Sequence, residues 1–247
     1  MPDEELLSGG NVAPAVVRIG RTVRKPWTAS TASVSHFVAF LRSAGVDAPA
    51  AHGRDEQGRH VQEYVPGRLA IDAAPLTHDQ LRRVGAMVRG IHDASAHYVA
   101  PPDAVWDSAI PAPGAEFVCH NDLAPWNLIL GDRWVFIDWD AAAPSTRLWD
   151  LAYAAQTFTL NDPGREPAGA AEDLAAFIDG YGAEDALRRR LPGVLARRTA
   201  AMYELLRSSR EHGTEPWASM YSAGHGEHWR AAAAYVAAHS AIWAAAL

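Results

Sequence analysis

The sequence predicts an α+β fold, with a small lobe of antiparallel strands over residues 1–65 followed by a mainly helical lobe over residues 66–247. Short runs rich in β-branched residues occupy the first part, whereas apolar residues recur at helical spacing in the second. Pro66-Gly67 lies between the two patterns and marks the expected crossover. A chain of 247 residues, 49% of them hydrophobic, can bury one core or two small lobes that share a cleft.

The first lobe contains three clear strand patterns and one helix pattern. Strands are expected over 15–19 and 22–25, separated at Gly20, and over 59–65. Apolar residues repeat every three to four positions over 31–44, which predicts a helix that packs across the sheet.

The second lobe begins with a helix whose start is indicated by a capping box, Thr77 with Gln80. Two apolar runs, 128–130 and 134–137, flank Gly131-Asp132-Arg133 and predict a β-hairpin. Further helices are expected around residues 146–158, 171–181, 194–209 and 227–246.

The spacing of polar residues around this hairpin is typical of a phosphoryl-transfer centre. His120, Asp122 and Asn127 form an H-x-D-x-x-x-x-N pattern, and Asp138 follows the second hairpin strand. A carboxylate such as Asp122 can orient a hydroxyl nucleophile and accept its proton. Asn127 and Asp138 supply the hard oxygen ligands that Mg²⁺ prefers. Because the hairpin returns the chain to its starting point, we expect these side chains to share one cleft.

Three segments resemble the aminoglycoside phosphotransferase family, the small-molecule kinases of the protein-kinase-like fold. Residues 118–127 resemble the catalytic loop of that family, 136–140 its metal-binding segment and 148–153 the helix that follows. The resemblance implies Mg²⁺-dependent transfer of the terminal phosphate of ATP or GTP to a hydroxyl of a small molecule. Protein kinases themselves fit poorly, because no A-P-E motif follows and no room remains for an activation loop.

The resemblance also implies residues that bind the nucleotide. Arg24, with Lys25 as the alternative, is expected to steady the phosphates, and Gly9 and Gly10 lie where backbone amides could cover them. The backbone at Glu63 and Val65 is expected to bind the nucleobase, so the side chains do not decide between ATP and GTP.

Supporting roles follow from the same comparison. His120 is expected to be a buried scaffold residue and Asp150 to brace the catalytic loop, while Asp140 could assist the metal or meet a cationic acceptor. Cys119 is interpreted as a small buried hydrophobe rather than a nucleophile. The sequence departs from the family pattern in the helix over 31–44, which contains no acidic residue to pair with the phosphate-binding cation.

The overall composition indicates which classes of binding partner and which cellular compartment to expect. A net charge of −7 argues against nucleic-acid binding, and no apolar stretch is long enough to cross a bilayer. One cysteine and an acidic start suit a cytoplasmic protein. Arg197-Arg198 is interpreted as part of a solvated helix face. The oligomeric state stays open.

An aminoglycoside-like antibiotic is the first candidate acceptor, and choline, homoserine, a sugar or a macrolide are alternatives. A cationic acceptor could meet acidic residues of the later helices, namely Glu172, Asp173, Asp179, Glu204, Glu211 and Glu215. The alternative of another class is a non-catalytic nucleotide- or metabolite-binding protein on the same fold, which the missing helix acid and the glycine-poor first loop favour.

Overall fold

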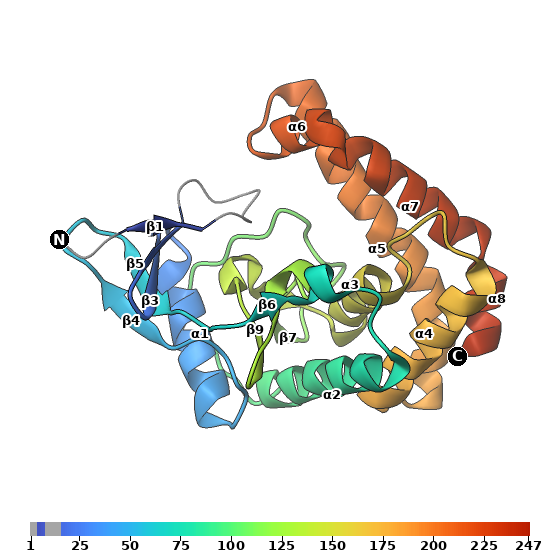
Figure 1. Ribbon diagram of the computed structural model, residues 1–247, viewed down its shortest axis with the longest axis horizontal. Helices are drawn as coiled ribbons and strands as arrows, with labels where there is room; N and C mark the ends of the chain where they lie inside the picture. Colours follow the sequence, from blue (N-terminus) through green and yellow to red (C-terminus); the bar gives the residue numbers. More distant parts are fainter. Residues whose placement is uncertain (1–3, 8–15) are drawn as a thin grey trace.

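The computed structural model describes residues 4–7 and 16–247. Gly9 and Gly10, predicted to cover the phosphates, lie outside the described residues. Figure 1 shows a small sheet at one end of the molecule, a group of helices at the other, and short strands between them. The predicted α+β fold is confirmed.

The small sheet is antiparallel and has the strand order β1-β2-β3-β5-β4. Its strands are β1 (Glu5–Leu6), β2 (Val17–Ile19), β3 (Thr22–Lys25), β4 (Ala51–Arg54) and β5 (His60–Glu63). In β3 the buried residues alternate with half-buried ones, so Val23 and Lys25 face the interior and Arg24 faces the other side. This alternation decides which cation of β3 faces the interior of the molecule.

Helix α1 (Thr31–Ser43) joins the sheet to the rest of the molecule. Its apolar face, with Phe37 and Leu41 fully buried, belongs to the same core cluster as the helices of the second part. The Phe37 ring packs against the Trp139 ring with centroids 5.9 Å apart. The helix therefore fixes the position of the segment that contains Asp138.

The predicted hairpin is present among the short strands between the small sheet and the helices. Strands β8 (Leu128–Leu130) and β9 (Trp134–Phe136) pair antiparallel, and β6 (Arg68–Leu69) adds to β8. The second small sheet pairs β7 (Phe117–Cys119) with β10 (Ala143–Ser145). Three single turns of 3₁₀ helix lie next to these strands: η1 (Ala70–Ala73), η2 (Pro125–Asn127) and η3 (Trp139–Ala141).

The remaining described elements are helical. They are α2 (His78–Ser95), α3 (Arg147–Thr159), α4 (Pro167–Tyr181), α5 (Asp185–His212), α6 (Trp217–Met220), η4 (Tyr221–His225), α7 (Gly226–Ala238) and α8 (Ser240–Ala246). The capping box of Thr77 and Gln80 is present at the start of α2. The segment expected as one helix over 227–246 divides into α7 and α8 at His239.

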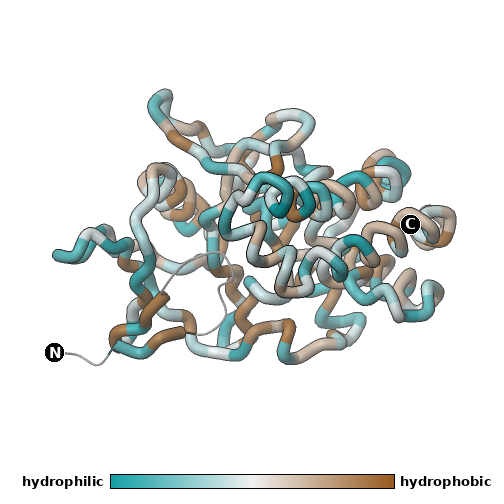
Figure 2. Tube along the Cα trace, turned by 90° about the horizontal axis from the view of Figure 1, so that it is seen from above, coloured by the Kyte–Doolittle hydropathy of each residue, from teal (hydrophilic) through white to brown (hydrophobic). Residues whose placement is uncertain are grey.

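Hydrophobic and hydrophilic positions alternate along the helices of this second part (Figure 2), as amphipathic packing requires. Helices α2 and α4 approach closely because Gly85 and Gly180 present no side chain at their contact. Within the described residues, no helix combines the length and the apolar character that a bilayer crossing requires.

Candidate active site

Asp122 and Asn127 lie side by side in the loop between β7 and β8. The Asn127 side-chain amide donates hydrogen bonds to the Asp122 backbone carbonyl at 3.0 Å and to Asp122 Oδ2 at 2.7 Å. These bonds use the nitrogen of the Asn127 side chain. Its Oδ1 is therefore the atom available to a ligand, and no described residue donates to it.

The hairpin brings Asp138 to the same place. Leu128 pairs with Phe136 at the base of the hairpin, and the Ile137 amide donates to the Asn127 carbonyl at 2.8 Å. Buried His120 connects the two segments, since its Nε2 lies 3.2 Å from the Ile137 carbonyl and its Nδ1 accepts from the Asp122 amide at 3.3 Å. Burial lowers the pKa of His120, which fits this neutral bridging role.

The backbone is left-handed at two non-glycine residues beside the site. Asn121 has a φ of 64° and Asp138 a φ of 58°. Such conformations cost about 1–3 kcal/mol each and persist only where the surroundings enforce them. For Asn121, the side-chain amide donates to the carbonyls of Ala141 and Ala143, both at 3.2 Å. The two strained positions are thus the residue directly before Asp122 and Asp138 itself.

Asp122 has two further neighbours that the sequence did not reveal. The Tyr153 hydroxyl of α3 donates to Asp122 Oδ1 at 2.9 Å. The Arg198 guanidinium of α5 lies over the Tyr153 ring at 4.1 Å and donates to the Asn121 carbonyl at 3.3 Å. Burial, aided by the charge of Asp138, raises the pKa of Asp122 to about 7 against the effects of Tyr153, Asn127 and Arg198.

The expectation that Arg198 belongs to a solvated face is wrong, because only 4% of the residue is exposed. Leu191, Leu195 and Met202 lie three to seven positions away and are also buried, so residue 198 falls on the buried face of α5. The same spacing rule could have found Tyr153, which is three residues after Asp150 on α3 and shares its face.

The structure places Lys25, rather than Arg24, beside Asp138 and Asp140. Lys25 Nζ lies 2.6 Å from Asp140 Oδ1 and 3.3 Å from Asp138 Oδ1. Arg24 points to the opposite face of β3, where its Nε lies 3.5 Å from Asp55 Oδ2. The cation at the site is therefore Lys25 and not the expected Arg24, because adjacent side chains of a strand point to opposite faces of the sheet.

At the expected hinge, the side chain of Glu63 is occupied by other groups. It pairs with Arg133 and Arg42, accepts from the Ala50 amide, and lines a cavity of about 300 Å³ together with Arg133. The Val65 side chain is buried with Ile129. The side chains of Glu63 and Val65 are thus engaged elsewhere, and the Glu63 amide already donates to the Ala50 carbonyl at 2.8 Å.

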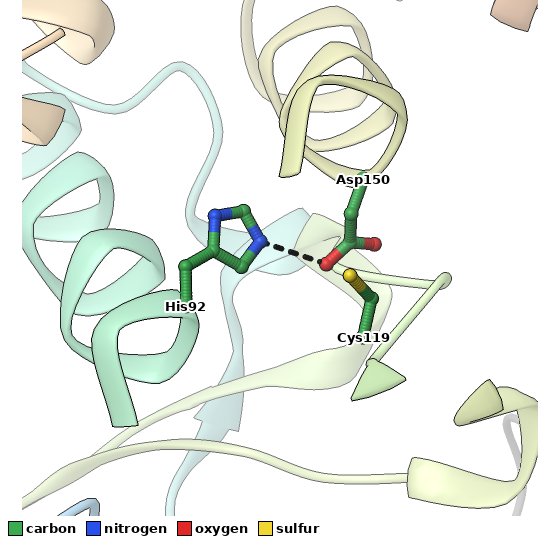
Figure 3. Close-up of side chains that lie close together, drawn as sticks. All are labelled: His92, Cys119 and Asp150. Carbon is green, nitrogen blue, oxygen red and sulfur yellow. Dashed lines mark hydrogen bonds and ion pairs between the residues drawn. The ribbon is translucent and has the colours of Figure 1, made fainter. Parts of the chain in front are cut away.

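Asp150 is fully buried between the catalytic loop and α2 (Figure 3). Its Oδ1 accepts from the Asn121 amide at 2.8 Å, the bracing contact that the resemblance implies, and its Oδ2 lies 3.0 Å from His92 Nε2. Cys119 lies close to both, but burial raises the pKa of its thiol well above the ordinary value. The other His92 nitrogen bonds the Tyr181 hydroxyl at 2.9 Å. These contacts indicate a structural hydrogen-bond cluster rather than a metal site.

The acid, the amide and the second acid that the sequence spaces like a phosphoryl-transfer centre are thus joined by the hairpin. Residues 102–194 match the model of the phosphotransferase enzyme family. This match confirms the predicted resemblance over the segment that holds the catalytic loop. Over these residues the chain is similar to phosphotransferases, and the solved small-molecule kinases described below share its fold.

Individual relatives are similar to this chain over most of its length. A trifolitoxin immunity protein from Rhizobium leguminosarum bv. trifolii is 27% identical over 197 residues, which are 74% of this chain and 75% of that protein. A choline/ethanolamine kinase family protein from Mesorhizobium loti shares the fold, with a TM-score of 0.61 at 18% identity over 95% of this chain and 92% of the other.

Two solved enzymes bound to antibiotics have the same fold. An amicoumacin kinase in complex with AMP-PNP, Ca²⁺ and amicoumacin gives a TM-score of 0.69 at 14% identity, covering 94% of this chain and 88% of that one. A spectinomycin phosphotransferase in complex with ADP and spectinomycin gives 0.62 at 12% identity, covering 99% and 93%.

Proposed function

We propose that the protein transfers the terminal phosphate of ATP or GTP, with Mg²⁺, to a hydroxyl of a small molecule. The main support for this proposal is that the β8–β9 hairpin brings the segment of Asp138 back to the loop that holds Asp122 and Asn127. Asp122 would orient the acceptor hydroxyl and take its proton. Catalysis in this class depends mainly on positioning and charge neutralisation, which fits a cleft built from fixed polar groups.

Mg²⁺ fits the residues present. Asn127 Oδ1 and the Asp138 carboxylate are hard oxygen ligands, and the Asp138 side chain is 46% exposed toward solvent. When bound, the ion would neutralise the phosphate charge. Lys25 would add a second positive charge at the phosphates, and the backbone at Glu63 and Val65 would hold the nucleobase. We place the division between a nucleotide-covering lobe and an acceptor-binding lobe after residue 65.

For the acceptor we propose an antibiotic-like molecule that carries an apolar or aromatic part. The printed names of the relatives support an antibiotic, and the partly buried aromatic residues next to the catalytic loop support the apolar part. These are Trp126, Tyr203, Trp217 and Tyr221, which pack with Tyr153 and Trp229.

The acids expected to meet a cationic acceptor are mostly engaged. Asp173 pairs with Arg165 and His78, and Asp179 with Arg188. On α5, Arg207 holds both Glu204 and Glu211, and Ser219 bonds Glu215. A polycationic aminoglycoside would have to displace these partners, which makes it a poorer candidate than a compound of low charge.

The decisive experiment compares Asp122→Asn and Asp138→Asn with the wild type. We expect Asp122→Asn to lower turnover by about two to four orders of magnitude, because the base is lost while the shape is kept. Its affinity for the Mg-nucleotide should stay near the wild-type value, whereas Asp138→Asn should weaken that affinity. Acceptors would first be found by thermal shift with Mg-nucleotide present, since a specific ligand stabilises the folded state.

Wild-type turnover in Asp122→Asn would remove Asp122 from its proposed role. Nucleotide binding without phosphate transfer to any acceptor of a broad panel would favour the non-catalytic binding protein instead.

A further inference from the structure

Helix α1 offers no acidic residue to Lys25. Its sequence from Thr31 to Ser43 contains only neutral side chains and Arg42. Where α1 faces Lys25, a cavity of about 10 Å³ lies between them, and Ser35, His60 and Asp140 share its lining. Such a space holds about one water molecule. Of the α1 residues that line this cavity, Val34, Ser35 and Val38, only Ser35 is polar, which makes residue 35 the place to test an acid.

Lys25 nevertheless needs compensation, because the residue is only 4% exposed. A buried ammonium group is costly unless it is paired, and the carboxylates of Asp138 and Asp140 lie 3.3 Å and 2.6 Å from Lys25 Nζ. The other neighbours are uncharged near neutral pH. Ser35 is neutral, and burial together with the charge of Lys25 lowers the pKa of His60 to about 4. Among the described side chains, the two carboxylates supply the compensation.

The two acids are not equivalent. The contact of Lys25 with Asp140 is the shorter one, 2.6 Å against 3.3 Å for Asp138. Asp140 is also held firmly by its own segment, since Trp139 is buried, donates from Nε1 to the Phe136 carbonyl at 3.0 Å and packs on Phe37 of α1. A metal ion that engaged Asp138 would leave the Lys25–Asp140 pair in place.

We propose that Asp140 is the positioning residue that holds Lys25 for the nucleotide phosphates, in place of the helix acid that α1 lacks. The proposal rests on the proposed function for the role of Lys25. It assigns Asp140 neither to the metal nor to the acceptor, which were the two roles suggested by the sequence. The acidic residue that α1 lacks is then replaced by Asp140. Its absence from α1 does not by itself indicate a loss of activity.

The experiment moves the carboxylate from the 3₁₀ turn to the helix. Four variants are compared with the wild type: Asp140→Ala, Asp138→Ala, and Asp140→Ala combined with either Ser35→Glu or Ser35→Gln. The Ser35→Gln combination is the matched control, because it has the size of the Glu variant without its charge. Binding of ATP and GTP is measured by calorimetry over a series of Mg²⁺ concentrations, and the Tm of each variant is recorded.

We expect Asp140→Ala to weaken nucleotide binding by about 10- to 100-fold, the range of a lost charged hydrogen bond. The Mg²⁺ concentration that gives half-maximal binding should stay near the wild-type value in Asp140→Ala and rise in Asp138→Ala. Adding Ser35→Glu should restore most of the affinity, and adding Ser35→Gln should not. If Asp140→Ala does not fold at 25 °C, the isosteric Asp140→Asn replaces it.

Three results would overturn the proposal while the wild type still binds nucleotide. They are an unchanged affinity in Asp140→Ala, a rise in its Mg²⁺ requirement that matches Asp138→Ala, and equal effects of Ser35→Glu and Ser35→Gln. A wild-type chain that binds neither ATP nor GTP would overturn the proposed function together with this inference.

Discussion

The two oxygens of the Asp122 carboxylate receive different donors, Tyr153 at Oδ1 and Asn127 at Oδ2. Asn127 is tied to the loop itself, whereas Tyr153 comes from α3 and is buried, so it fixes the carboxylate relative to the helices. A residue outside the sequence motif thus controls the orientation of the proposed base.

We predict that Tyr153→Phe lowers kcat by about 10-fold with little change in the KM for nucleotide, because one hydrogen bond to the base is lost and no phosphate contact changes. Steady-state kinetics would measure both constants. Tyr235→Phe is the control, since it also removes one hydrogen bond of a buried tyrosine, to the Arg165 carbonyl, without touching Asp122. Equal losses in the two variants would assign the effect to packing.

His60 gives the fold a dependence on pH. Burial and the charge of Lys25 lower its pKa in the folded state to about 4, from an ordinary value of 6.5. As the pH falls below 6.5, the unfolded chain binds the proton first, so this contribution to stability is full above that pH and is lost as the pH falls toward 4.

We therefore predict that His60→Asn flattens the decline of the free energy of unfolding between pH 6.5 and 4, which urea titrations at several pH values would measure. His52→Asn, at an exposed position of β4, is the control and should leave the slope unchanged. The same slope in both variants and the wild type would show that His60 does not titrate on unfolding.

At the scale of elements, the contact of α2 with α4 depends on two glycines. A Cβ built at Gly85 would lie 2.1 Å from the Phe177 carbonyl oxygen, and one at Gly180 would lie 2.0 Å from the Arg82 carbonyl oxygen. Both obstacles are backbone atoms, so the helices would have to move apart.

We predict that Gly85→Ala destabilises the protein by more than about 1 kcal/mol although alanine favours helix, because the overlap outweighs the propensity gain. Gly90→Ala on the same helix meets no atom within 4 Å and should stabilise instead. Thermal or urea unfolding of the two variants would measure the difference. Stabilisation by both substitutions would contradict the close contact.

At the scale of the whole molecule, one core cluster joins the two parts. It contains Phe37 and Leu41 of α1 together with residues of α2, α3 and α4. The small sheet is thereby anchored through its helix rather than tethered only by the crossover at Pro66-Gly67.

We predict a single cooperative unfolding transition, with circular dichroism and tryptophan fluorescence giving the same midpoint in urea. Saturating Mg-nucleotide should raise that midpoint, because a ligand bound to the folded state adds about 2.7 kcal/mol at a hundredfold excess over Kd. Two separate transitions would show that the sheet and the helices unfold independently.

The sequence by itself determined the elements that depend on local patterns. The capping box at Thr77, the hairpin around Gly131 and the spacing from His120 to Asp138 are local signals, and each is found where it was expected. Periodicity also located α1 and the start of α3 to within a residue or two.

Only the tertiary structure decided which side chains meet across the cleft. Arg24 and Lys25 are adjacent cations, and the face of β3 that turns inward selected Lys25. Tyr153 and Arg198 reach the catalytic loop from α3 and α5, so no spacing within the loop could indicate them. His92 of α2 bonds Asp150, which in turn holds the loop. The physical reason is that a motif fixes residue types along the chain, whereas burial and compensation of charge depend on segments that packing brings together.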